Sequence, residues 1–454
     1  MQTSEIARMV STAKEYYWPT FARDASFFDL PTSIITSAEG LFVVDIHGNR
    51  YLDTIFGSGA MYLGYNHPEV MEAMLGQMKR VASQCTFFVP TPPAILLAEK
   101  IASLTPGSLK YTIFGSNGTD ANETAIKIAR QYWKIKGQGT KYKVIGRKRN
   151  YHGMGLGTLS ASGHMFRRAP FEPLMPGFIL INSPICYRCP YDLTYPECGV
   201  LCAQELRRAI EFEHPSTVAC YIGEQTIGGG GVVPPPPEYM KIIRDICDEY
   251  DVLLIADEVI TGFGKTGFWF ECQKYGIVPD IITMGKGIGA GYGPLSGTHV
   301  KSEIAELFKG KDAFQHGYTF GGLGYLAAAG LAAIEYVERH NLLARATELG
   351  TKIRQELEAI KEGSAVVGDV RVNGVMAAVE LVKDKATKAE FPDRAAVARL
   401  VADVGLKNGV LLNCLTWYGD IILLFLPLNT SDEELGMVFH ALAQAVAEVE
   451  RRFL

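Results

Sequence analysis

Short apolar runs alternate with segments of helical periodicity through the middle of the chain. The runs occupy residues 109–114, 141–146, 216–223, 251–259 and 280–286. Because strands that are apolar on both faces must be covered on both sides, this pattern predicts a mostly parallel sheet between two layers of helices. Ligands of such sheets bind beyond the carboxyl ends of the strands, so those ends are where we expect chemistry.

The two ends of the chain follow a different pattern. Residues 33–53 alternate like a small antiparallel meander, with "HGNR" as its turn. After residue 325 come long helical segments and two strand-rich segments, and Ser431 with Glu434 has the spacing of a capping box before the last helix. We expect a large α/β domain over residues 59–324 and a smaller α+β domain built from residues 1–58 and 325–454.

Composition narrows the classes of function. The 454 residues are 48% hydrophobic, enough for a substantial core, and the net charge of −5 indicates no basic surface for nucleic acid. No apolar run reaches the ~18 residues of a membrane span, and the first residues carry acids where a secretory signal has an apolar stretch. The odd number of cysteines, nine, is typical of reduced thiols. We therefore expect a cytoplasmic protein that binds neither membranes nor nucleic acid.

Two charged residues end neighbouring apolar runs. Asp257 closes "LLIAD", and Lys286 follows 29 residues later, surrounded by glycines. One intervening helix fits that gap, so both side chains can face one crevice. A desolvated lysine has a lowered pKa and can act as a nucleophile that forms an imine. The plainer alternatives are a salt-bridged acid and a lysine that reaches solvent at a strand end.

Two further segments supply groups for a ligand at the same edge. Gly118 and Thr119 stand between a strand and a helix start, where free N–H groups can bind an anion or where the threonine serves only as a cap. Tyr151 and His152 follow another strand and can stack on or orient a planar ligand, or pack in the core. A lysine, an acid, an aromatic ring and a phosphate cradle together fit pyridoxal 5'-phosphate (PLP).

Five segments, in order, resemble the motifs of the class III (omega-type) aminotransferases, which are PLP enzymes of fold type I. They read "YLGYNHPEVMEAM", "SNGTDANETAIKIAR", "YIGEQTIGGGGVVPPP", "IADEVITGFGKTG" and "TMGKGIGAGYGPLSG". The fourth is similar to the family's "DEV-TGFGRTG", with a lysine in place of its arginine. The resemblance covers nearly the whole chain and implies a large, mostly parallel, seven-stranded type of sheet beside the smaller domain.

The resemblance also implies roles for individual residues. Lys286 would form the internal aldimine and then move the proton, Asp257 would pair with the ring nitrogen, and Glu224 would lie near the cofactor's phenolic oxygen or gate the pocket. The other implied cofactor contacts are Gly118 and Thr119 for the phosphate, Tyr151 and Val259 for the two ring faces, His152 beside the ring, and Thr319 for the phosphate of a neighbouring subunit. A homodimer or a dimer of dimers with shared active sites is the expected assembly.

The expected carboxylate-binding arginines of the family are missing. Leu423 and Met154 stand where relatives carry them. The resulting substrate pocket is predicted to be apolar and to contain Trp18, Met61, Phe87, Phe88, Met154, Trp417 and Leu423. The resemblance implies that the segment with Phe87 and Phe88 lines the pocket of the neighbouring subunit. Arg167 or Arg168 is an alternative donor for a carboxylate, with surface arginines as the plainer interpretation. Without a second arginine, we expect pyruvate to be preferred over 2-oxoglutarate.

A four-cysteine segment is a second departure from the relatives. Cys186, Cys189, Cys198 and Cys202 have a spacing that can hold structural zinc, although catalysis requires no metal. Packed thiols or a disulfide are the alternatives.

The leading hypothesis is therefore transfer of an amino group to pyruvate from an aliphatic amine, a diamine, beta-alanine, gamma-aminobutyrate or taurine. The same lysine chemistry also serves amino-acid racemases, epimerases and aminomutases, and decarboxylating transaminases, so these remain alternatives at this point.

Overall fold

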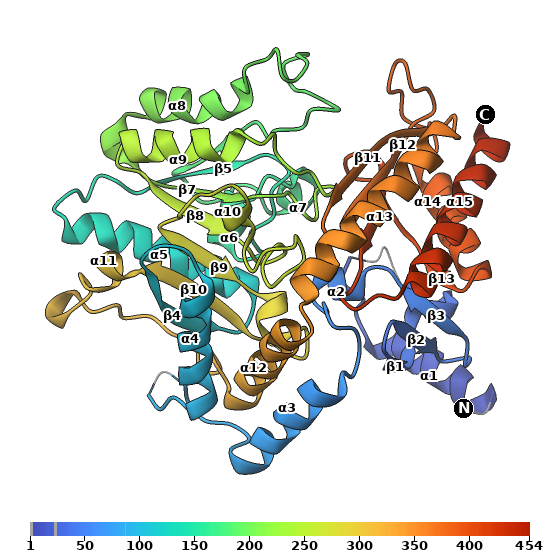
Figure 1. Ribbon diagram of the computed structural model, residues 1–454, viewed down its shortest axis with the longest axis horizontal. Coiled ribbons are helices and arrows are strands. Elements are labelled where there is room, and N and C mark those ends of the chain that lie inside the picture. The colour runs from blue at the N-terminus through green and yellow to red at the C-terminus, as the bar shows by residue number, and fades with distance from the viewer. Residues whose placement is uncertain (1–2, 22–24, 87) are drawn as a thin grey trace.

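The computed structural model describes residues 3–21, 25–86 and 88–454, and its largest element is a seven-stranded sheet (Figure 1). The strands lie in the order β4-β10-β9-β8-β7-β5-β6. All run in one direction except β10, which is antiparallel to both neighbours. Their bounds are β4 Leu109–Gly115, β5 Lys143–Arg147, β6 Phe178–Ile181, β7 Val218–Glu224, β8 Leu253–Asp257, β9 Ile281–Met284 and β10 Ser296–Lys301. The predicted mostly parallel sheet is confirmed.

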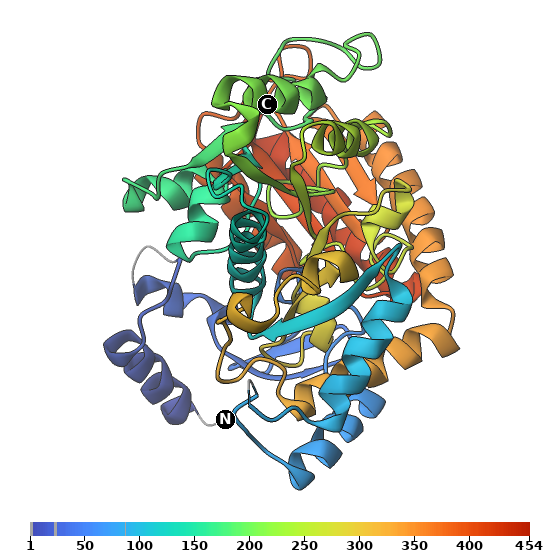
Figure 2. The ribbon, with the colours of Figure 1, turned by 90° about the vertical axis from the view of Figure 1, so that its left-hand side faces the viewer.

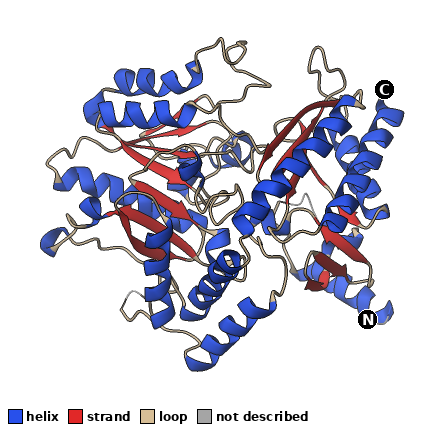
Figure 3. Ribbon diagram, in the orientation of Figure 1, coloured by secondary structure: helices blue, strands red, loops and turns tan. Residues whose placement is uncertain are grey.

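Alternate side chains of the central strands enter two different cores. Val144 and Leu253 pack in one buried cluster with Trp133, whereas Ile145 and Leu254 pack in the other. This explains the continuous apolar runs, because both faces of each strand are covered by helices (Figure 3). The covering helices include α5 Gly118–Ile135 on one face and α8 Leu201–Glu213 and α9 Tyr239–Glu249 on the other.

A smaller domain joins the two ends of the chain. β13 of the C-terminal part pairs in parallel with β3 of the N-terminal meander, giving a sheet of order β1-β2-β3-β13. A second, antiparallel sheet has the order β11-β12-β15-β14. The bounds are β1 Ile35–Glu39, β2 Phe42–Asp45, β3 Arg50–Asp53, β11 Val367–Asn373, β12 Met376–Leu381, β13 Val410–Leu411, β14 Asn413–Leu415 and β15 Asp420–Phe425.

The helices of this domain cover its sheets. They are α13 Leu342–Glu362, α14 Arg394–Lys407 and α15 Asp432–Phe453. α15 begins with the predicted capping box, since Ser431 N–H donates to Glu434 Oε2 (2.8 Å) and Glu434 N–H donates back to Ser431 Oγ (3.2 Å). The expected fold class, with a smaller α+β domain from both ends of the chain, is confirmed.

The remaining helices connect and flank the two domains. They are α1 Thr3–Tyr16, α2 Phe56–Gly59, α3 Pro68–Arg80, α4 Pro92–Leu104, α6 Leu156–Ala161, α7 Met165–Arg168, α10 Glu271–Lys274, α11 Ser302–Ala305 and α12 Gly324–Arg339. α12 packs against α3 and α4, and α1 lies at the edge of the molecule in both views (Figures 1 and 2). The boundaries that the sequence suggests between the two domains, near residues 58 and 324, remain predictions from the sequence.

None of the helices within the described residues has the length and apolar character that crossing a membrane requires.

Candidate active site

Three strand ends and one helix start meet around a cavity of about 400 Å³. Glu224 is the last residue of β7, Asp257 is the last residue of β8, and Lys286 follows β9. Gly118 and Thr119 at the start of α5 line the same cavity. Because β7, β8 and β9 are adjacent and parallel, their carboxyl ends place all three charged side chains at one edge of the sheet.

Asp257 is buried but well supplied with hydrogen bonds. Its Oδ2 accepts from Asn122 Nδ2 (2.8 Å) and from His152 Nδ1 (2.6 Å), and its Oδ1 accepts from the N–H of Val259 (3.0 Å). These three hydrogen bonds engage both oxygens and fix the orientation of the carboxylate at the end of β8. The arrangement presents a fixed negative charge to the cavity.

Asn122 is a site residue that the sequence analysis missed. Its Nδ2 donates to Asp257 and to the carbonyl of His152 (2.9 Å), and its Oδ1 accepts from Thr283 Oγ1 (2.7 Å). One amide thereby ties α5 to the ends of β8 and β9 and to the loop after β5. The signal in the sequence was a polar residue on the buried face of an amphipathic helix.

Lys286 has a strained backbone conformation and an amine with a lowered pKa. Its φ of 45° lies in the left-handed region, a costly conformation for a residue with a side chain. Burial lowers the pKa of Lys286 to about 8, although Glu224 and Asp257 oppose this shift and part of the side chain still faces the cavity. A larger fraction of uncharged amine makes the side chain a better nucleophile and proton acceptor.

Glu224 is held by the backbone on both oxygens. Oε1 accepts from the N–H of Tyr151 (2.9 Å), and Oε2 accepts from the N–H of Gly228 (2.8 Å). Burial, together with the nearby charge of Asp257, raises the pKa of Glu224. A carboxyl group with a raised pKa can hold a proton close to the reacting atoms.

The first turn of α5 can bind an anion. The N–H groups of Gly118 and Thr119 belong to the first turn, where no intrahelical carbonyl accepts from them, while Asn117 caps the turn by accepting from Asp120 N–H (3.1 Å). A Cβ on Gly118 would come within 2.9 Å of Val259, so the bare backbone and the valine side chain are in contact. This brings Val259 to the floor of the cavity, beside the anion-binding turn.

Comparison with known proteins agrees with this geometry. The model of the family "Aminotransferase class-III" matches residues 27–446. The chain belongs to the class III aminotransferases.

Three relatives illustrate the range of this family. The uncharacterized aminotransferase YhxA of Bacillus subtilis is 42% identical over 89% of this chain and 90% of its own length. The taurine–pyruvate aminotransferase of Bilophila wadsworthia is 33% identical over 99% of both chains. A solved amine transaminase from an uncultivated Pseudomonas species, in its PLP-bound form, has a TM-score of 0.90 and 33% identity, and covers 96% of this chain and 99% of its own.

Class III aminotransferases depend on PLP, and the residues of this chain fit that cofactor. The cavity offers the carboxylate of Asp257, the amine of Lys286 and the aromatic ring of Tyr151, and the start of α5 offers N–H donors for a phosphate. Nε2 of His152 is buried and has no hydrogen-bond partner within the described residues, and a polar atom of the cofactor would supply one.

The two candidate arginines differ in their surroundings. Nη1 of Arg168 donates to the carbonyls of Ser160 (3.0 Å) and Ser162 (2.6 Å), so it holds the backbone. The Arg167 guanidinium instead lies among aromatic rings, with Cζ 4.4 Å from the ring centroid of Tyr151 and 4.7 Å from that of Trp417. Its positive charge contributes to the lowered pKa of Lys286.

The predicted substrate-pocket residues lie at various distances from Lys286. Met61 packs against Gly291 of the cavity wall, and Met154 is partly exposed with its N–H directed at Thr119 Oγ1 (3.4 Å). Leu423 is buried in a cluster with Ile260, one layer behind the wall. The other members are Trp18 and Phe88, which are exposed, Trp417 beside Arg167, and Phe87, which is outside the described residues.

The four-cysteine segment is not arranged as a metal site. Cys186, Cys189, Cys198 and Cys202 border one cavity of about 20 Å³, and all four are free thiols. Across the described ranges, no group of three or more His, Cys, Asp or Glu residues is placed to hold a metal ion. The zinc site, the disulfide and the packed thiols therefore all stay predictions from the sequence, and Cys186 is exposed while the other three cysteines are partly buried.

Proposed function

We propose that the protein transfers an amino group from an amine or omega-amino acid to pyruvate, with Lys286 as the reacting side chain. The observation that carries this proposal is the convergence of a lysine of lowered pKa and a buried, hydrogen-bonded aspartate at adjacent strand ends. Racemases and aminomutases can use the same pair, but the family supports transamination. Formation of a keto or aldehyde product from the amine donor tests the proposal, and a racemised or rearranged amino acid without such a product would contradict it.

Each side chain of the site has a different role in the proposed reaction. PLP, when bound, supplies an electron sink for the charge left when the substrate carbon loses its proton. Asp257 would hold its carboxylate against the ring nitrogen of PLP and keep it protonated, and the N–H groups at the start of α5 would bind the phosphate. Lys286 accepts the proton from one carbon and returns it to another, which its lowered pKa favours near neutral pH.

We infer that Arg167 binds the carboxylate of the acceptor. It is a cation near Lys286, and its guanidinium makes no hydrogen bond or ion pair to a carboxylate of the described residues. Its flat faces lie near the rings of Tyr151 and Trp417, which leaves its N–H edges to bind a ligand. One arginine suits an acceptor with one carboxylate, such as pyruvate.

Replacing Arg167 by methionine is expected to raise KM for pyruvate by about 10- to 100-fold, since a charge-assisted hydrogen bond is lost. Steady-state kinetics with a fixed amine donor measure this effect. Propanal, an acceptor without a carboxylate, should react with little change in KM.

Arg168→Met is the matched control. Because Arg168 holds the carbonyls of Ser160 and Ser162, this change should lower thermal stability and leave KM for pyruvate nearly unchanged. An unaltered KM for pyruvate in R167M would rule out the role of Arg167.

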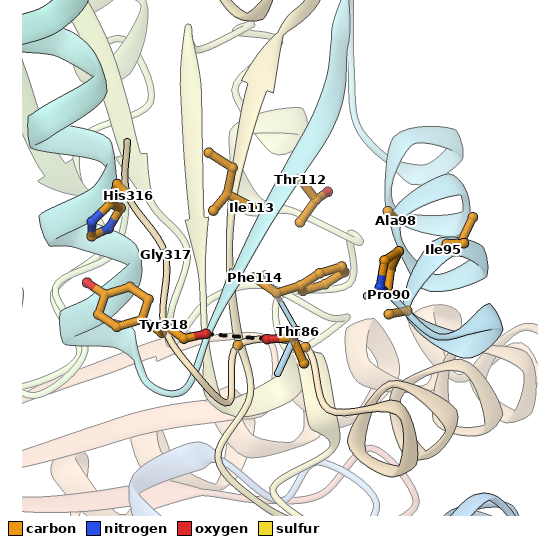
Figure 4. Close-up of a pocket in the computed structure, with 13 residues that line it drawn as sticks. Thr86, Pro90, Ile95, Ala98, Thr112, Ile113, Phe114, His316, Gly317 and Tyr318 are labelled. Carbon is orange, nitrogen blue, oxygen red and sulfur yellow. Dashed lines mark hydrogen bonds between the residues drawn. The ribbon is translucent and has the colours of Figure 1, made fainter. Parts of the chain in front are cut away.

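We propose that two copies of the chain form the working unit. Thr319 is exposed and does not line the cavity around Lys286; its carbonyl accepts from the N–H of Thr86 (3.3 Å). Next to it lies an apolar pocket of about 430 Å³, shown in Figure 4, where Thr86 Oγ1 donates to the Tyr318 carbonyl (3.3 Å). Exposed Ile95 lines this pocket, and exposed Phe320 lies between the lining residues Tyr318 and Gly321 in the chain; exposed apolar side chains gathered in this way are typical of an interface.

Mixed dimers test whether Thr319 serves the other subunit. Thr319→Val alone is expected to weaken PLP binding by about 10- to 100-fold through loss of one phosphate hydrogen bond. When T319V is co-expressed with K286A, about half of the dimers contain one subunit of each kind. Each of these mixed dimers has one site with both Lys286 and Thr319 intact, so we expect roughly a quarter of wild-type activity at limiting PLP. Activity no higher than that of the separate variants would contradict a shared site, and light scattering gives the mass of the assembly.

A further inference from the structure

A glycine-rich loop follows Glu224 and leads into a strained residue. Residues 228–231 are all glycine, and the backbones of Ile227 and Val233 close the base of the loop by exchanging hydrogen bonds (3.0 and 2.9 Å). Val232 is fully buried and has a φ of 46°, in the left-handed region that a β-branched residue rarely adopts. Such a conformation persists only where its surroundings enforce it, and it is common at functional sites.

The side chain of Val232 is enclosed where the two domains meet. It belongs to a buried cluster that also contains Ile260, a residue that lines the cavity around Lys286. The other buried members come from β12 and β15 of the smaller domain and are Met376, Ala378, Ile421, Leu423 and Phe425. The smaller domain therefore supplies apolar packing around the strained residue.

The backbone next to Val232 is held by an arginine of the smaller domain. Arg371 of β11 is buried, with 8% of its surface exposed, and its Nε donates to the carbonyl of Gly231 (2.9 Å). Its Nη1 donates to Oδ2 of Asp369 (2.7 Å) and to Oε2 of Glu380 (2.7 Å). Because a guanidinium is planar and its donors form a fixed fork, these two carboxylates orient the N–H that reaches the loop.

The contact of Arg371 leads through the loop to the Glu224 carboxylate. The peptide whose carbonyl Arg371 binds also contains the N–H of Val232, and that N–H donates to the carbonyl of Gly228 (3.0 Å). The N–H of Gly228 in turn donates to Oε2 of Glu224 (2.8 Å). Each step of this path is a hydrogen bond to or from the backbone of the loop.

We propose that Arg371 is a positioning residue for Glu224: by holding the strained peptide before Val232, it keeps the N–H of the first loop glycine on the Glu224 carboxylate. Glycine has the widest range of backbone conformations, so a segment of four glycines keeps one conformation only when outside contacts hold it. The role rests on the proposed function and deepens it, because it makes a residue of the smaller domain responsible for the geometry of a carboxyl group in the cavity.

Loss of the Arg371 contact should change the proton affinity of Glu224. Burial and the charge of Asp257 raise the pKa of Glu224, whereas the hydrogen bonds from the N–H groups of Gly228 and Tyr151 lower it. A weaker bond from Gly228 favours the neutral acid, so the pKa of Glu224 should rise further. The other charged or titratable groups near Glu224 lie outside the loop and are His152, Lys286, Arg147 and Tyr418.

Amide hydrogen exchange of the apo-protein tests the structural part without relying on catalysis. Arg371→Lys keeps a cation beside the two carboxylates but lacks the fork that binds them and the loop together. Arg188→Met is the matched control, because Arg188 Nε donates to Oε1 of the same Glu380 (2.5 Å) and Arg188 makes no hydrogen bond to the loop within the described residues. Peptides over residues 225–233 should exchange about tenfold faster in R371K and at the wild-type rate in R188M.

The pH dependence of the half-reaction with an amine donor tests the link to Glu224. Glu224→Gln identifies the ionisation of Glu224, because this variant lacks it. We expect R371K to move that ionisation upward by about one pH unit, the shift that corresponds to one lost hydrogen bond, and R188M to leave it in place.

Three results would overturn the proposal. They are unchanged exchange in R371K, equally faster exchange in R371K and R188M, and faster exchange in R371K with an unmoved ionisation of Glu224. R371K is preferred to R371M because it keeps the buried charge and therefore the fold. A wild-type protein without any half-reaction would contradict the proposed function itself, and the exchange rates would still show whether Arg371 holds the loop.

Discussion

Replacing Lys286 by alanine is expected to lower kcat of amino transfer by about 10²- to 10⁴-fold or more. The amine is proposed both to bond to the cofactor and to move the proton, and no other amine lines the cavity within the described residues. Rapid-quench measurement of a single half-reaction, with PLP added in excess, gives the rate of the chemical step.

The protein itself should tolerate this change. The Lys286 amine makes no hydrogen bond within the described part of the chain, so K286A should retain the thermal stability of the apo-protein and still bind PLP at the start of α5. Added PLP should therefore still raise the Tm of K286A. A folded K286A protein that turns over at the wild-type rate would contradict the assignment.

Replacing Asp257 by asparagine is expected to lower kcat/KM by about 10²- to 10³-fold, as does loss of a preorganised electrostatic group in other enzymes. Asparagine has nearly the shape of aspartate but carries no negative charge. Its amide would occupy the place of the carboxylate to which Asn122 and His152 now donate hydrogen bonds. Steady-state kinetics at saturating PLP separate this effect from weaker cofactor binding.

Asn122→Ala is the graded control for D257N. It removes one hydrogen bond from the carboxylate but leaves its charge, so a loss of only about tenfold is expected. Equal losses in the two variants would show that orientation, not charge, is what Asp257 contributes.

Much of the site could be predicted because it lies at the ends of apolar strands. Asp257 and Lys286 were placed at adjacent strand ends from their sequence spacing, and β8 and β9 are indeed parallel neighbours. Strand β10 was not predicted, since "SGTHVK" is polar. It is buried because its polar groups are satisfied: Thr298 Oγ1 donates to the Ala121 carbonyl (2.8 Å), and His299 lies between Thr105 and Thr112.

Other features depend on contacts that no local pattern encodes. Arg167 and Arg168 are adjacent in the sequence, which gives no reason to assign them different roles. Their contacts distinguish them, because Arg167 lies beside the ring of Tyr151, whereas Arg168 donates hydrogen bonds to backbone carbonyls. Asn122 is far in sequence from the acid that it orients. Leu423 was aligned with a substrate-binding arginine, yet its side chain is in a buried cluster behind the cavity wall.

The most direct test of the central claim is the location of the cofactor on the chain. Wild-type protein loaded with PLP is reduced with borohydride and digested, and the peptides are sequenced by mass spectrometry, with K286A as control. We expect one pyridoxyl-bearing peptide, modified at Lys286 and absent from K286A. A modification at another lysine such as Lys265, or no modified peptide from folded, cofactor-loaded protein, would contradict it.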